Sequence, residues 1–123
     1  MTENDRSPRI AQIVGVARGL LETEGPGGLT MRSVADRLGI QAPSLYKHLD
    51  DKEELEALLQ AEALRGMGDA LREALQALSG RAGTRRRVEA LGQAYRSWAH
   101  AHPHLYRLAT GGPLARDRLP AGL

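Results

Sequence analysis

The 123-residue chain contains no cysteine. A disulfide framework, a thiolate-bound metal and a cysteine nucleophile are therefore excluded, and such a sequence is typical of the cytosol. The chain also lacks any run of about 18 apolar residues, the length that a membrane-spanning helix needs, and its first nine residues, MTENDRSPR, are polar. We expect a soluble cytoplasmic protein with no targeting segment and no membrane contact.

A strong excess of one charge is missing as well. The formal net charge is +2, with a sequence pI of about 9.4. Residues 1–52 carry seven Lys and Arg against seven Asp and Glu, and the remainder carries ten against eight. The basic pI is a weak indication of nucleic-acid binding, but the distribution does not identify a DNA-binding half. Any basic surface must therefore be local.

Strand patterns are absent too, because no segment sustains a two-residue alternation and β-branched residues are scarce. Apolar residues recur instead at helical spacing, so the fold class is all-α. The segment 111–123 contains two prolines and no clear period, and we assign it no structure. The predicted helices cover residues 8–24, 31–38, 42–48, 51–79, 88–102 and 103–109.

The longest predicted helix, 51–79, has a clear beginning and an irregular interior. Asp51 and Glu54 have the spacing of a capping box, in which the first side chain caps the helix and the second reaches back. Gly66 and Gly68 lie inside the helix, and each costs about 1 kcal/mol relative to Ala. We therefore expect a kink or a close helix contact there.

The two short helices between Thr30 and His48 have the spacing of a helix-turn-helix. Thr30 caps the first, Ala35 is small enough for a close crossing, and Gly39 suits a left-handed turn. Ile40 and Leu45 are expected to bury the second helix. The outward residues are then Gln41, Ala42, Ser44, Tyr46, Lys47 and His48. Such side chains suit base edges and phosphates in a major groove, although an αα-hairpin with a solvated outer face has the same spacing.

The segment that includes LGIQAPSLYKHLDDKEEL, with Leu29-Thr30 and Val34-Ala35 before it, resembles the signature of the tetracycline-repressor (TetR/AcrR) family of transcriptional regulators. The resemblance covers the first four predicted helices. It implies operator-DNA contacts at Thr30, Arg32, Ala42, Pro43, Ser44, Tyr46, Lys47, His48 and Lys52.

Side-chain chemistry divides these implied contacts into two groups. Ala42, Pro43, Ser44 and Lys47 lie early enough in the recognition helix to meet base edges, whereas Thr30, Arg32, Tyr46, His48 and Lys52 are better placed for phosphates. This sequence departs from the family at Leu49, where an aromatic residue is usual. Asp50 and Asp51 also bring carboxylates near Lys52, and we interpret them as helix caps.

The later stretch YRSWAHAHPHLYRLATGGPL resembles the start of a WHG-type C-terminal effector domain of the same family. Tyr95, Trp98, Tyr106 and Leu108 are candidates for lining an effector pocket, and plain core packing is the alternative. His100, His102 and His104 have metal-ligand chemistry. Residues two apart on a helix point to nearly opposite sides and Pro103 redirects the chain, so we expect no metal site.

These observations predict a DNA-binding domain at 1–52 followed by a helical effector-binding and dimerisation domain at 53–123. Family members usually continue through several more helices, so we expect the second domain to be truncated. The resemblance implies a ligand-responsive repressor, homodimeric in its full-length form, that binds a palindromic operator and a small-molecule effector. We expect no cofactor and no enzymatic activity, since Ser-His-Asp and HExxH arrangements are absent. A helical protein-interaction module without DNA binding is the alternative.

Overall fold

The computed structural model describes residues 8–111. Residues 112–123, most of the segment to which the sequence analysis assigned no structure, lie outside the described residues. Within residues 8–111 the structure is helical and contains no strand, which confirms the all-α prediction. None of the helices between residues 8 and 111 is long and apolar enough to cross a membrane. The elements are α1 (Pro8–Glu24), the short 3-10 helix η2 (Pro26–Gly28), α2 (Met31–Leu38), α3 (Ala42–Leu45), α4 (Lys52–Gln76), α5 (Thr84–Ala101) and α6 (Pro103–Thr110).

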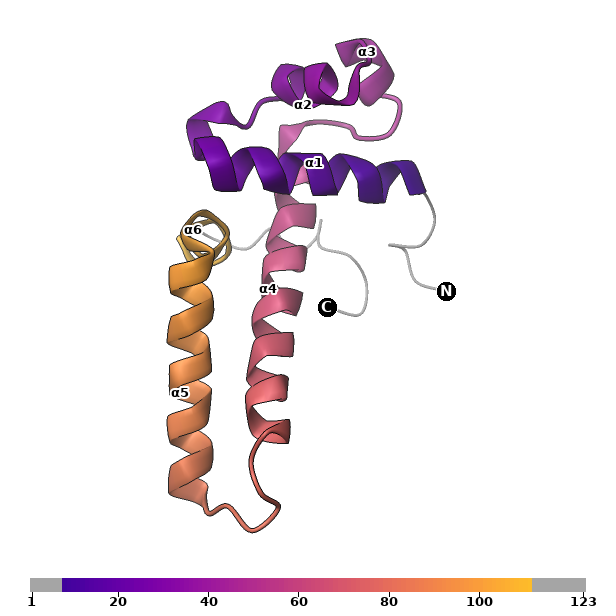
Figure 1. The fold of residues 1–123 in the computed structure, drawn as a ribbon. Helices are drawn as coiled ribbons and strands as arrows, with labels where there is room; N and C mark the ends of the chain where they lie inside the picture. The colour runs from indigo at the N-terminus through magenta and orange to yellow at the C-terminus, as the bar shows by residue number, and fades with distance from the viewer. Residues whose placement is uncertain (1–7, 112–123) are drawn as a thin grey trace.

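The helices form a head and a stem (Figure 1). In the head, α1 crosses the start of α4, and α2 and α3 lie on the far side of α1 from the stem. In the stem, α5 runs back alongside α4, and α6 then turns across beneath α1. The α4–α5 loop is therefore at the opposite end of the molecule from α3.

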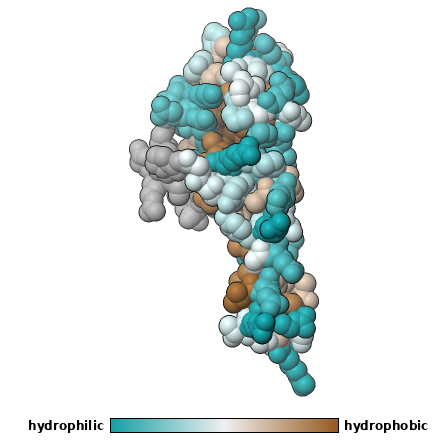
Figure 2. All heavy atoms as spheres, turned by 90° about the vertical axis from the view of Figure 1, so that its left-hand side faces the viewer, coloured by the Kyte–Doolittle hydropathy of each residue, from teal (hydrophilic) through white to brown (hydrophobic). Residues whose placement is uncertain are grey.

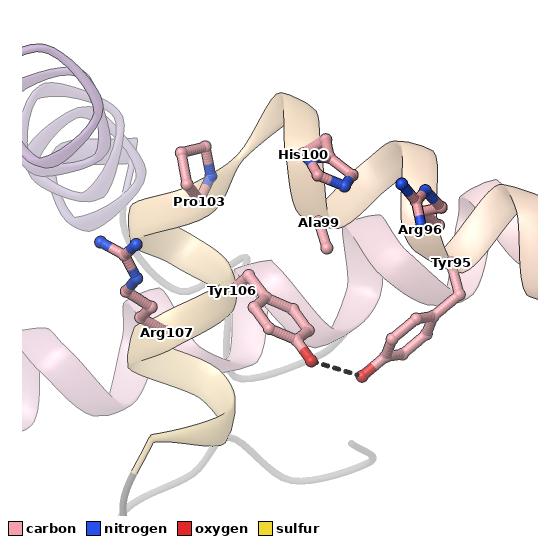
Figure 3. A pocket seen from close by; sticks show the side chains of 7 residues that line it. All are labelled: Tyr95, Arg96, Ala99, His100, Pro103, Tyr106 and Arg107. Carbon is pink, nitrogen blue, oxygen red and sulfur yellow. Dashed lines mark hydrogen bonds between the residues drawn. The ribbon is translucent and has the colours of Figure 1, made fainter.

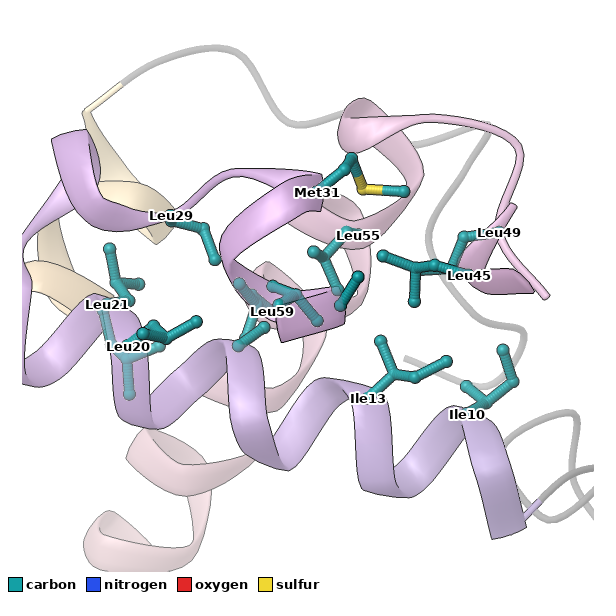
Figure 4. Packing of buried hydrophobic residues seen from close by; sticks show 14 of the residues in the cluster. Ile10, Ile13, Leu20, Leu21, Leu29, Met31, Leu45, Leu49, Leu55 and Leu59 are labelled. Atoms are coloured by element: carbon teal, nitrogen blue, oxygen red, sulfur yellow. The ribbon is translucent and has the colours of Figure 1, made fainter. Parts of the chain in front are cut away.

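A single cluster of buried side chains holds the head on the stem (Figure 4). Leu55, Leu59 and Ala63 of α4 join residues of α1, α2 and α3 in it, and Leu105 and Ala109 of α6 join as well. Each fully buried Leu contributes about 1.5–3 kcal/mol relative to an exposed one. The domain border at residue 52 stays a prediction, because side chains on both sides of it pack into this one cluster.

The lower stem is covered much less completely. No side chain of α5 is buried, and Val88 is 61% exposed. Figure 2 shows hydrophobic atoms at the surface of this part of the molecule, whereas hydrophilic residues cover most of the head. The lower stem is therefore held together chiefly by contacts between α4 and α5.

The helix caps predicted at Thr30 and Asp51 are present. Thr30 Oγ1 accepts a hydrogen bond from Ser33 N at 2.9 Å, and Thr30 N donates to Ser33 Oγ at 2.9 Å. At the start of α4, Asp51 Oδ1 accepts from Glu54 N at 2.8 Å, and Glu54 Oε1 reaches back to accept from Asp50 N at 2.8 Å. These bonds satisfy amide groups that have no partner inside the helix.

Gly66 is the site of a close helix contact, as predicted. A methyl group added there would lie 3.3 Å from Trp98 Nε1 of α5. The same addition at Gly68 would meet nothing within 4 Å. Gly66 therefore lets the indole of Trp98 approach the backbone of α4.

The prediction that the recognition helix extends to His48 is wrong. The α-helix ends at Leu45, and the amides of Lys47 and His48 donate only three residues back, to Ser44 O at 3.3 Å and to Leu45 O at 2.9 Å. The chain tightens here because Leu49 must enter the core, where it is 1% exposed, before the extended Asp51 starts α4. The burial of Leu49 also shows that an aliphatic side chain fills this position of the core.

Candidate nucleic-acid interface and ligand cleft

The turn between α2 and α3 has the geometry that the sequence predicts. Gly39 is left-handed, with φ of 74°, and Ile40 N donates to Ala35 O at 3.0 Å. Ala35 is buried in the core cluster. Ser44 N then donates to Gln41 O at 2.9 Å and starts α3. A residue with a Cβ would be strained at Gly39, because left-handed backbone costs about 1–2 kcal/mol for L-residues.

Leu45 anchors α3 to the head. Its side chain is 0% exposed and belongs to the same cluster as Val34, while Ile40 packs against that cluster half-buried. The short helix is therefore fixed by one side only. Its other side stays open to solvent.

The ten predicted DNA-contact residues are all accessible. Tyr46 is 49% exposed, Ala42 and Ser44 are half-buried, and Ala42 also packs against the core cluster. The remaining exposed residues are Thr30, Arg32, Gln41, Pro43, Lys47, His48 and Lys52. The structure thus places these residues in and around α2 and α3 and at the start of α4, at the head end of the molecule (Figure 1). Their contact with DNA stays a prediction.

The cations of this surface are not neutralised within the described part of the chain. Arg32, Lys47 and Lys52 form no ion pair with any acidic side chain of residues 8–111. Arg18 differs, since it pairs with Glu62 across the α1–α4 contact at 2.8 Å. The positive charge around α2 and α3 is therefore available to an anion such as a phosphate.

A second feature is an open cleft of about 620 Å³ between α5 and α6. Tyr95 and Tyr106 meet there edge to face, with ring centroids 5.8 Å apart, and Tyr95 Oη donates to Tyr106 Oη at 3.1 Å (Figure 3). This hydrogen bond, and after it burial, raises the pKa of the Tyr95 hydroxyl above its usual value. The complete lining is Tyr95, Arg96, Ala99, His100, Pro103, Tyr106 and Arg107.

The structure separates the four predicted effector-pocket residues into two pairs. Tyr95 and Tyr106 line the cleft, whereas Trp98 and Leu108 pack against the core cluster. Trp98 also lies against the His102 ring, with centroids 4.9 Å apart. Sequence reasoning missed the polar lining, Arg96, His100 and Arg107. The four-residue spacing of Arg96 and His100 could have indicated that they share a face of α5.

The three histidines near Pro103 go to three different places. His100 lines the cleft, His102 Nδ1 lies 3.3 Å from Glu22 Oε1 of α1, and the His104 ring lies beside Gly25 at the end of α1. Within residues 8–111 no group of three side chains is arranged to hold a metal ion. His102 and His104 instead connect the junction of α5 and α6 to the end of α1.

Two family profiles match the chain. Residues 13–58, which include α2, α3 and the turn between them, match the family described as "Bacterial regulatory proteins, tetR family". Residues 88–122 match a profile described as "Tetracyclin repressor-like, C-terminal domain". The two matches occur in the same order as the two regions of resemblance in the sequence.

Curated relatives carry similar descriptions. The chain is 38% identical over 105 residues to an uncharacterized HTH-type transcriptional regulator of Mycobacterium tuberculosis, covering 85% of this chain and 46% of that protein. It is 29% identical over 110 residues to an HTH-type transcriptional regulator of Mycobacterium bovis, covering 89% and 47%. The chain therefore spans about half the length of the curated relatives that it matches.

Solved structures agree on the fold. A protein of unknown function from Rhodococcus sp. RHA1 superposes with a TM-score of 0.79 at 26% identity, over 96% of this chain and 61% of the other. A possible TetR family transcriptional regulator from Streptomyces coelicolor A3(2) gives 0.65 at 27% identity, over 89% and 53%. The arrangement of head and stem is thus shared with solved proteins of similar sequence.

Proposed function

Because the chain belongs to the tetR family of bacterial regulatory proteins, we propose that it regulates transcription by binding operator DNA through α2 and α3. The observation that carries this proposal is the construction of α3. Leu45 fixes α3 to the core from one side, and the turn that follows the helix presents Tyr46, Lys47 and His48 to solvent. In helix-turn-helix proteins the second helix lies in the major groove, and a short helix fixed to the core with exposed polar residues in and after it suits that placement.

The contacts divide by chemistry. Ser44 and Lys47 can hydrogen-bond base edges, and Ala42 and Pro43 offer apolar contact to a thymine methyl group. Arg32 and Lys52 bind phosphates, because both are exposed and unpaired within residues 8–111. The remaining proposed contacts, which fix register on the backbone, are Thr30, Gln41, Tyr46 and His48.

The protein acts in the cytoplasm as a homodimeric repressor in its full-length form. A palindromic operator presents half-sites about 34–36 Å apart, so two heads are needed to bind it. A small-molecule effector bound beside α4, α5 and α6 changes the separation of the heads, because α4 and α6 share the core cluster with α1–α3. Effector and operator then weaken each other's binding through their differential affinity for two states. The role is non-enzymatic and needs no cofactor.

The test is fluorescence anisotropy with labelled duplex DNA from the intergenic region beside the gene. The triple variant Ser44→Ala, Tyr46→Ala, Lys47→Ala should lose specific binding. Arg86→Ala, at the far end of the stem, should bind like the unchanged chain. Circular dichroism melting shows that each variant is folded.

Binding that is absent, or that the triple variant retains, contradicts the proposal. Binding to a helical protein partner with little salt dependence would instead favour an interaction module, because phosphate contacts make DNA affinity steeply salt-dependent. Sedimentation of the same sample determines whether the chain dimerises, which separates a failure of assembly from a failure of the reading helix.

A further inference from the structure

The α5–α6 cleft is lined by cationic and aromatic side chains. Of the seven described residues that line it, none is acidic, and Arg96, His100 and Arg107 supply its basic groups. Its volume of about 620 Å³ is in the range of small-molecule sites in proteins, about 300–1,000 Å³. An anion would therefore enter without meeting a carboxylate of the lining.

Both arginines of the cleft are free to bind a ligand. Arg96 and Arg107 form no ion pair with the acidic side chains of residues 8–111, unlike Arg37 and Arg72, which pair with Glu24 at 3.4 Å and Asp69 at 2.7 Å. A guanidinium group is planar and matches the two oxygens of a carboxylate. The charge of the cleft thus favours a carboxylate group on the ligand.

The rest of the lining favours a flat apolar body. The Tyr95 and Tyr106 rings offer aromatic surface, and Ala99, one turn after Tyr95 on α5, adds aliphatic surface (Figure 3). The hydrogen bond between the two hydroxyls uses one of their two protons, so the other can be donated to a ligand oxygen. Aromatic rings pack edge to face or offset on such surfaces.

From this lining we propose that the α5–α6 cleft binds a small aromatic carboxylate. The carboxylate lies against Arg96 or Arg107, and the ring lies against the two tyrosines. The inference deepens the proposed function, since it gives the chemical class of the effector, and its effect on DNA binding rests on that function. The binding of the carboxylate does not rest on the proposed function, because the residues that line the cleft are the only evidence for it.

The cleft is next to contacts with the DNA-binding head. His100 and Pro103 line the cleft, and the neighbouring His102 and His104 lie against Glu22 and Gly25 at the end of α1. A ligand that moves the α5–α6 corner therefore acts on α1 directly. Aromatic carboxylate binding should change the operator affinity of the chain.

The experiment is isothermal titration of the full chain with benzoate, benzamide and inorganic phosphate. Benzoate and benzamide have nearly the same shape and differ in charge, whereas phosphate has charge without a ring. We expect benzoate to bind about tenfold or more tightly than either, as charge-assisted hydrogen bonds imply. The double variant Arg96→Gln, Arg107→Gln should lose that advantage, and Arg86→Gln on the same helix should keep it.

The proposal is overturned if benzoate does not bind, or if it binds no more tightly than benzamide or phosphate. It is also overturned if the double variant binds benzoate as the unchanged chain does. Anisotropy without added carboxylate tests DNA binding separately. If DNA binding fails while benzoate binds through the arginines, the proposed function is wrong and the cleft assignment stands. If DNA binds while benzoate does not, the cleft assignment is wrong and the proposed function stands.

Discussion

Replacing Arg32 with glutamine should make DNA binding less sensitive to salt. Arg32 is exposed near the start of α2 and forms no ion pair within residues 8–111, so its charge is available to a phosphate. Each phosphate neutralised by a protein cation releases condensed counterions, and the slope of log K against log salt is about −0.9 per phosphate. The Arg32→Gln variant removes one such contact from each head.

The magnitude depends on how many heads are bound. A dimer on a palindromic site loses two contacts, so the slope should become less steep by about 1.8. Over a fourfold rise in salt, the affinity of the unchanged chain should then fall about 12-fold further than that of the variant. A single head on a half-site should show half the change in slope, about 0.9.

The assay is anisotropy of a labelled duplex at four or more salt concentrations, with Arg86→Gln as the matched control. Arg86 is exposed in the first turn of α5, at the opposite end of the stem from α3 (Figure 1). Its replacement makes the same change in net charge. An unaltered slope in Arg32→Gln, or an equal change in both variants, would refute the assignment of Arg32 to a phosphate.

Two further predictions concern the turn and the cleft. Gly39→Ala should lower the free energy of unfolding by about 1–2 kcal/mol, because Gly39 has φ of 74°, a left-handed backbone that strains residues with a Cβ. The added methyl group would meet nothing within 4 Å, so backbone strain is the expected cause. A denaturant melt that shows no loss of stability in the variant would contradict this prediction. Tyr106→Phe should lower the pKa of Tyr95 toward its usual value, because the hydrogen bond to Tyr106 is the largest cause of the raised pKa. The pKa is measured by ultraviolet titration. If Tyr95 ionises at the same pH in the variant as in the unchanged chain, the prediction is wrong.

Local rules in the sequence predicted much of the head. The cap at Thr30, the left-handed turn at Gly39 and the burial of Leu45 each follow from residue type and spacing, and the structure contains all three. The end of α3 did not follow from such rules. It depends on Leu49 entering a core that residues of several helices build, so no local pattern marks it.

The cleft shows a second limit of sequence reasoning. The sequence indicated both Tyr95 and Trp98 for the effector pocket, but their spacing does not say which side of α5 faces α4. Trp98 packs toward α4 beside Gly66, and Tyr95 faces the cleft. Arg96 and Arg107 line the same cleft only because the chain turns at Pro103, and the direction of that turn depends on the packing of α6 in the core.

The most direct test of DNA reading by α2 and α3 is to map amide chemical shifts of the ¹⁵N-labelled chain while its intergenic duplex is added. We expect the largest changes on residues 30–32, 41–48 and 52, with little change in the lower stem. Changes centred on α5, or the same small changes along the whole chain, would contradict it.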